Sequence, residues 1–175
     1  EMLVLMILMS LSASVGPFVG RNWGARKVDR VYKVLTSSYK FCFAWGILCF
    51  IFLAPFGDDL VALINDDAKL VESAGWYFLL VPVTFGLLGV GMISGSLFVA
   101  LGKPLPTTVM SLFRMIVVYI PLAILFDEYW GYIGIFIATS VANVIMGCVA
   151  FFWSRNMLAR EVKILGDARV REEVV

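Results

Sequence analysis

The chain has 175 residues, of which 61% are hydrophobic and only 15% are charged, and its mean hydropathy is +0.93. Soluble domains are close to half apolar and need polar residues to cover their surface, so this composition excludes a water-soluble globular fold. Histidine is absent, and with it the usual triads, zinc sites and general bases, so we expect no enzyme, no metal site and no cofactor. The formal net charge of +1 does not indicate a nucleic-acid partner.

The apolar residues are grouped into five segments, and a helix that crosses the hydrocarbon core of a bilayer needs about 20 such residues. Backbone groups in lipid must pair within their own segment, so we expect helices. The sequence therefore predicts an all-α, polytopic membrane helix bundle over residues 1–154, with the lipid bilayer as its partner, and a tail over 155–175. The predicted spans are residues 2–20, 34–56, 74–101, 107–126 and 129–153.

The first three spans differ in length and in proline content. The first contains Pro17, where we expect a kink because proline has no amide hydrogen. The second has a short apolar core, preceded by polar residues that extend the helix toward the headgroups. The third is the longest and would measure ~42 Å as a straight helix, so we expect it to tilt or to bend at Pro82. Its Phe85 and Met92 are candidates to line a hydrophobic cavity, and facing lipid is the alternative.

The fourth span contains a charged residue, Arg114, and a third candidate hinge, Pro121. An arginine in hydrocarbon costs several kcal/mol, yet one near the end of a span can extend its charge to the headgroups or face a wet cleft. Both interpretations of Arg114 stay open. A snorkelling arginine would tolerate replacement by lysine, whereas a cavity residue would not.

The fifth span carries Thr139 and Asn143, which are four residues apart and therefore share one face of a helix. Asn143 lies ~15 Å from the end of the span, which places it near the middle of the membrane. Polar side chains in spans either bond to a neighbouring helix or contact a transported molecule. Asn143 is a candidate for either role.

Small residues recur every four positions in three spans, a pattern that lets helices approach closely. We expect these residues mainly to pack the bundle. They are Ser12, Gly16 and Gly20, then Gly91 and Gly95, and finally Gly134, Ala138 and Ala142.

Nearly all of the 14 basic residues fall on one side of the predicted membrane. They occupy the segment after the first span, the turn after the third and the tail, whereas the other two loops are mainly acidic. Basic short loops stay in the cytoplasm, so we expect the start of the chain outside and the carboxyl terminus inside, in a bacterial inner membrane.

The segment 17–31 resembles the repeat motif of multidrug and toxic compound extrusion (MATE) transporters. The family pattern is close to Gly-Gln-Asn-x-Gly-Ala followed by a basic amphipathic stretch. Arg21 stands where the pattern usually has glutamine. The residues that carry the match are Gly20, Asn22, Gly24 and Ala25.

Two further segments are similar to this family in the same order along the chain. Residues 95–104, which end in Gly102, Lys103 and Pro104, resemble the turn between the fourth and fifth helices of a lobe. Residues 131–138, leading to Asn143, are similar to the start of a lobe's last helix. Three weak motifs in register, covering nearly the whole chain, are a stronger indication than any one alone.

The resemblance implies a fold of twelve helices in two lobes of six, with this chain as an incomplete carboxyl-terminal lobe. The five spans would be helices eight to twelve, and the amino-terminal lobe would be a missing partner, so we expect the chain to be a fragment. The implied activity is export of small amphipathic cations coupled to Na⁺ or H⁺. Because the third span has no carboxylate, we expect the coupling site outside this chain.

Two alternatives remain. One is a flippase for lipid-linked saccharides from the same broad superfamily, which would need cations to hold a pyrophosphate, and Arg114 is the one candidate. The other is a membrane scaffold that transports nothing.

Overall fold

The computed structural model describes residues 2–62 and 75–173, with side chains for 2–56 and 75–166, and it is helical throughout apart from short turns. Residues 75–80 form a helical turn that leads into the 3₁₀ helix η1. The named elements are α1 (Met2–Gly24), α2 (Val28–Ala62), η1 (Pro82–Thr84), α4 (Phe85–Ala100), α5 (Leu105–Leu112), the π-helix η2 (Phe113–Tyr119), α6 (Ile120–Trp130) and α7 (Tyr132–Glu173).

Five helical stretches of the described chain are long and apolar enough to cross a membrane. They confirm the predicted all-α membrane bundle and make this an integral, multi-pass membrane protein. Several boundaries differ from prediction, most of all at two places: the second stretch begins at Val28, and α7 continues through residue 154 without a break. Glu161 on this extension pairs with Lys103 beside the α4–α5 turn. The acidic loop at 63–74 lies outside the described residues.

The structure breaks the third span where Pro82 was predicted to bend it. Residue 81 is a bend, and Pro82 starts the 3₁₀ turn that leads into α4. The carbonyl of Leu80 accepts a hydrogen bond from the Ser140 hydroxyl of α7 at 3.0 Å, and that of Val81 accepts one from the Thr84 hydroxyl at 2.8 Å. Such hydroxyls stabilise a broken helix in lipid by pairing the backbone groups that the break frees.

The other two candidate hinges have different surroundings. Helix α1 runs through Pro17 to Gly24 without interruption. Pro121 directly follows η2 inside the continuous helix 105–130, so its missing amide lies in the interior of the span, where a helix normally needs that hydrogen bond. The span departs from α-helical bonding in the π-helix that ends directly before this proline.

Two residues with left-handed backbone close the turns at the basic end of the bundle. After α4, Gly102 has φ +73°, Lys103 N–H bonds to the Phe98 carbonyl at 2.9 Å, and Gly102 N–H bonds to the Val99 carbonyl at 2.9 Å. This is a Schellman motif, and Pro104 after it begins the next helix. The same bonds follow α1, where Arg26, with φ 56°, takes the glycine's place.

Gly102→Ala is expected to destabilise the protein by about 1 kcal/mol, because an L-residue is strained in the left-handed region. A Cβ here would meet no atom within 4 Å, so the cost comes from backbone strain alone. Thermal unfolding in detergent, followed by circular dichroism, measures the change. Gly102→Asn is the control, because asparagine tolerates this conformation better. Equal melting of the alanine variant and the unchanged protein would contradict the assignment.

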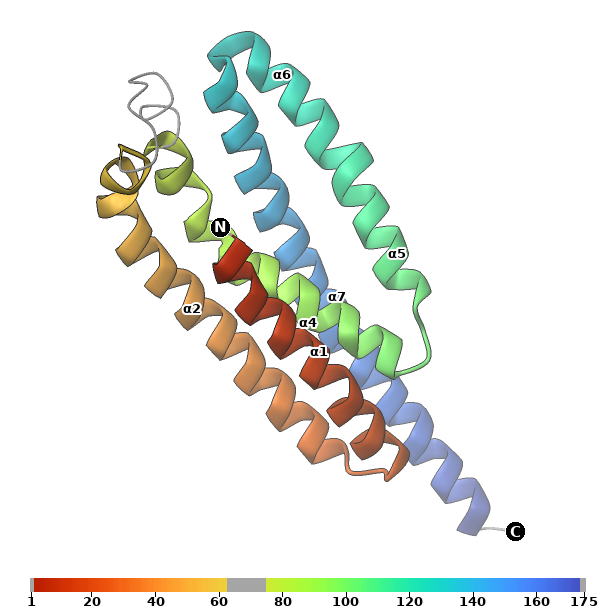
Figure 1. The fold of residues 1–175 in the computed structure, drawn as a ribbon. Coiled ribbons are helices and arrows are strands. Elements are labelled where there is room, and N and C mark those ends of the chain that lie inside the picture. Colours follow the sequence, from red (N-terminus) through yellow and green to blue (C-terminus); the bar gives the residue numbers. More distant parts are fainter. Residues whose placement is uncertain (1, 63–74, 174–175) are drawn as a thin grey trace.

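The core of the bundle lies among α1, α2 and α4, and α7 packs against α4 from the other side (Figure 1). Glycines allow the closest approaches. A Cβ on Gly46 of α2 would lie 2.5 Å from the Gly86 nitrogen of α4, and one on Gly134 would lie 2.1 Å from the Phe126 carbonyl oxygen. The expectation that small residues pack the bundle therefore holds for Gly134, in the tight hairpin between α6 and α7.

The helix formed by α5, η2 and α6 lies to one side of the bundle (Figure 1). It packs along α7 through α6 and approaches α4 only near the turn at Gly102. A cavity lies between this helix and the rest of the bundle.

Candidate substrate pocket

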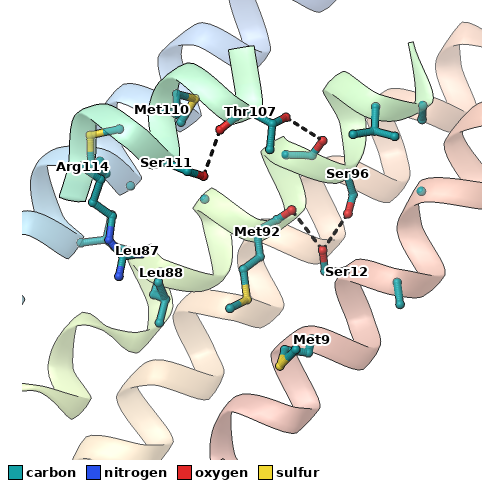
Figure 2. A pocket seen from close by; sticks show the side chains of 18 of the residues that line it. Met9, Ser12, Leu87, Leu88, Met92, Ser96, Thr107, Met110, Ser111 and Arg114 are labelled. Carbon is teal, nitrogen blue, oxygen red and sulfur yellow. Dashed lines mark hydrogen bonds between the residues drawn. The ribbon is translucent and has the colours of Figure 1, made fainter. Parts of the chain in front are cut away.

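A pocket of about 780 Å³ lies among α1, α4, α5, η2 and α7 (Figure 2). This volume is in the range of small-molecule sites in proteins. Its walls are formed mainly by apolar residues and by residues with small side chains. The apolar and glycine residues that line it are Met9, Ala13, Gly16, Pro17, Leu87, Leu88, Gly91, Met92, Gly95, Val99, Ala100, Met110, Met146 and Gly147.

Four hydroxyl side chains line the pocket, and each bonds to the protein itself. The Ser12 hydroxyl lies 2.7 Å from that of Ser96 and 3.0 Å from the Met92 carbonyl oxygen (Figure 2). Thr107 donates to the Gly95 carbonyl at 3.3 Å, and Ser111 donates to the Thr107 carbonyl at 3.0 Å. These bonds position α1 and α5 against α4 and leave two other polar side chains, Arg114 and Asn143.

Arg114 is the one charged residue among the described residues that line the pocket. It belongs to η2, and π-helical turns are rare and occur often at functional sites. The side chain is half-buried, and it forms no ion pair with a described residue. Figure 2 shows it extending toward Leu87 of α4. The pocket therefore has a positive group, and no carboxylate of a described residue lines it to neutralise that charge.

Asn143 of α7 lies in the pocket wall and is 97% buried. Its amide Nδ2 donates to the Thr84 hydroxyl at 3.0 Å, so the expected bond between helices is present and leads to the break at Pro82. Its carbonyl Oδ1 is buried and accepts no hydrogen bond from any described residue. A buried carbonyl without a donor is costly, so a donor from outside the described residues would stabilise this atom.

Three of the five predicted cavity residues, Met92, Arg114 and Asn143, line the pocket. Phe85 does not: it is 1% exposed and packs in the core, where α4 meets α2. Thr139 is also absent from the pocket wall, and its hydroxyl bonds to the Ile135 carbonyl of its own helix at 2.9 Å. We therefore remove Phe85 and Thr139 from the cavity candidates.

We predicted that the small residues mainly pack the bundle, but several of them line the pocket. Gly91 was assigned to helix packing, yet a Cβ there would meet nothing within 4 Å because the residue borders the pocket. Ser12, Gly16 and Gly95 also line it. The small-residue stripes of α1 and α4 were the available signal, because these helices contact each other at the pocket wall and small side chains there leave room beside the contact.

The motif residues named for the two turns do not line the pocket, although the matched segments also include wall residues such as Pro17 and Gly95. Those at the end of α1 form the turn to α2, where Asn22 donates from its side chain to the Phe18 carbonyl at 2.8 Å. The second motif forms the turn after α4. Both motifs therefore shape the basic end of the bundle. The residues are Gly20, Asn22, Gly24 and Ala25, and Gly102, Lys103 and Pro104.

The MatE family model matches residues 1–125, and the chain belongs to this family of transporters, whose members are not enzymes. A relative named FAD transporter, from Shewanella oneidensis, is 30% identical over 157 residues, which are 90% of this chain and 35% of the relative. The match covers about a third of that protein's length.

Solved MATE transporters have the same fold as this chain. The bent form of VcmN from Vibrio cholerae superposes with a TM-score of 0.85 at 24% identity, over 91% of this chain and 36% of that one. A multidrug resistance MATE family transporter in its inward-facing conformation gives a TM-score of 0.82 at 21% identity, with 91% and 37% covered. The likeness to part of these proteins agrees with an incomplete lobe.

Proposed function

We propose that this chain is the carboxyl-terminal part of a secondary active exporter that works by alternating access. The observation that carries the proposal is the pocket, which joins apolar walls with two polar groups, Arg114 and Asn143, in a protein of the MATE family. In such transporters two bundles rock about a central site. The partner we propose is an amino-terminal lobe, and the pocket would face it across that site.

We propose coupling to Na⁺ or H⁺ at a site in that partner lobe. In the described residues no group of three or more His, Cys, Asp or Glu side chains could hold a metal ion, and no carboxylate lines the pocket. We propose a bacterial inner membrane location with the carboxyl terminus in the cytoplasm. The basic turns at Arg26 and Lys103, together with the basic extension of α7, support this orientation.

The substrate we propose is amphipathic. The family resemblance implies organic cations, but Arg114 would repel a positive group, so this pocket is better suited to the apolar body and an anionic or neutral polar end. A positive end would then be held by the partner lobe. FAD, which the relative's name gives as its substrate, combines apolar rings with a pyrophosphate and has this character.

Asn143→Leu is expected to lower transport roughly tenfold. The substitution removes the unpaired carbonyl of Asn143, so a hydrogen-bond donor of the bound substrate would lose its partner. The change is made in the gene at its native locus, so that any partner lobe is present. Uptake of FAD and of ethidium, an organic cation, is measured in everted vesicles under an imposed H⁺ or Na⁺ gradient.

Thr139→Val is the matched control, one turn away on the same helix and outside the pocket. Vesicles are compared at equal amounts of protein, determined with an antibody against residues 155–175. Transport of both compounds by Asn143→Leu at the unchanged rate would remove the pocket from the transport path.

A further inference from the structure

A second cavity, of about 300 Å³, lies between α2 and α7 and is separate from the substrate pocket. One face of α2, with residues at positions 32, 35, 36, 39, 40 and 43, forms one wall, and residues 151, 154, 155 and 158 of α7 form the other. We propose that this groove binds an anionic phospholipid.

The floor of the groove is fixed by hydrogen bonds. The buried Tyr39 hydroxyl lies 3.0 Å from that of Ser94 on α4 and 2.9 Å from that of Ser154 on α7. The Tyr39 ring also meets the ring of Phe151 edge to face, with centroids 5.4 Å apart. These contacts join three helices behind the groove, so its shape is set before a ligand arrives.

Two cations, Lys40 and Arg155, line the groove from opposite walls. Both side chains are exposed, and neither forms an ion pair with a described residue. The Arg155 guanidinium carbon lies 5.5 Å from the centre of the Phe151 ring, which holds the charge at the groove. No carboxylate is among the described lining residues. Two cations facing one space favour a phosphate group between them.

The depth of these charges matches the headgroup region. Arg155 is six residues before Glu161, which pairs with Lys103 at the α4–α5 turn, so it lies ~9 Å farther into the membrane than that turn. A lone cation here extends toward water. Two of them above a fixed polar floor can instead hold a lipid phosphate at the boundary of the hydrocarbon.

An apolar stripe continues from the groove along α2. Phe43, Ile47 and Ile51 follow one another at four-residue intervals, and they are 43%, 60% and 59% exposed. From Lys40 to Ile51 the helix rises ~16 Å, which is close to half the hydrocarbon thickness. A positive end followed by an apolar stripe of this length is complementary to one phospholipid, with its phosphate at Lys40 and a chain along the stripe.

The test measures lipid retained by the purified, tagged protein as its native gene encodes it. Native mass spectrometry compares phosphatidylglycerol with phosphatidylcholine of the same acyl chains. We expect a preference for phosphatidylglycerol of roughly 25-fold, from two cations that each contribute about fivefold. The double variant Lys40→Gln, Arg155→Gln is expected to lose the preference.

The matched control is Lys33→Gln, Arg160→Gln, which removes two exposed cations of the same helices that do not line the groove. It is expected to keep the preference, as is the charge-conserving variant Lys40→Arg, Arg155→Lys. The charge-conserving variant decides the matter if the first double variant does not fold.

Four outcomes overturn the proposal. Equal retention of both lipids by the unchanged protein excludes a charge-selective site. Equal loss in the two glutamine variants assigns the preference to overall charge. Displacement of phosphatidylglycerol by an equal concentration of soluble glycerol phosphate shows a site for the headgroup alone, and a cross-link from the groove to a protein segment shows another occupant.

Discussion

Replacing Gly46 by alanine is expected to be among the most damaging single substitutions in the bundle, with a loss of about 2–3 kcal/mol in the free energy of unfolding. The added Cβ would lie 2.5 Å from the Gly86 nitrogen and 2.8 Å from its Cα. Both are backbone atoms, so no side chain can rotate away, and α2 and α4 must separate along their contact.

The separation would also affect the neighbours of that contact. Gly86 faces the Cys42 carbonyl oxygen, which would lie 3.1 Å from a Cβ on that glycine, so the approach is close from both helices. In lipid, close packing supplies much of the association between helices because there is little hydrophobic drive. Moving the two helices apart therefore loses dispersion contacts, and in lipid no hydrophobic effect compensates for that loss.

The measurement is unfolding in detergent with added dodecyl sulfate, followed by circular dichroism. Gly91→Ala is the control because it is also in a membrane-spanning helix and a Cβ there meets nothing within 4 Å. It is expected to leave stability unchanged or to raise it by up to about 1 kcal/mol, since alanine favours helix. Similar unfolding of the two variants would contradict the close contact.

Arg114→Gln is expected to raise the apparent KM for an anionic substrate roughly 10- to 100-fold, as loss of a hydrogen bond to a charged group does. Arg114 is the one charged lining residue among those described, so no other side chain in this pocket can take over its charge. Transport of the organic cation should be unchanged or improved, because a repulsive charge is removed.

Arg114→Lys separates two roles of the side chain. A residue that only extends to the headgroups is replaced by lysine without loss, because lysine snorkels equally well. A residue that holds an anion through a planar pair of donors loses part of its affinity. The measurement is initial uptake by everted vesicles with FAD and ethidium as test substrates. Equal loss for both, in either variant, would indicate a structural role for Arg114.

The fold was largely predictable because membranes restrict the choices. Length and hydropathy were sufficient to predict five helices. The missing amide hydrogen of Pro82 was sufficient to predict the break before α4. The donor from another helix that pairs with a carbonyl group at this break could not be predicted. Ser140 bonds to the Leu80 carbonyl only because α7 lies beside the break, and nothing local in the sequence encodes that neighbour. The bond from Thr84 to Val81, by contrast, is local.

The pocket was predictable only in part, for the same reason. Asn143 was predicted as a polar candidate inside the span, and the structure brings it into the pocket wall. Phe85 could not be placed, because α4 is apolar on all sides and its periodicity does not separate core from cavity. Gly91 and Gly134 lie in the same four-residue pattern, yet one borders a pocket and the other touches a backbone. Only the facing helix distinguishes them.

The distribution of side-chain hydrogen bonds gives the pocket walls unequal stiffness. Helices α1, α5 and α7 are each pinned to the third span or to its broken end, through Ser12, Thr107 and Asn143. Among the described residues, η2 and α6 make no side-chain hydrogen bond to another helix. We therefore expect a change in pocket width to move mainly the wall that carries Arg114. The charge that selects a substrate would then move with it.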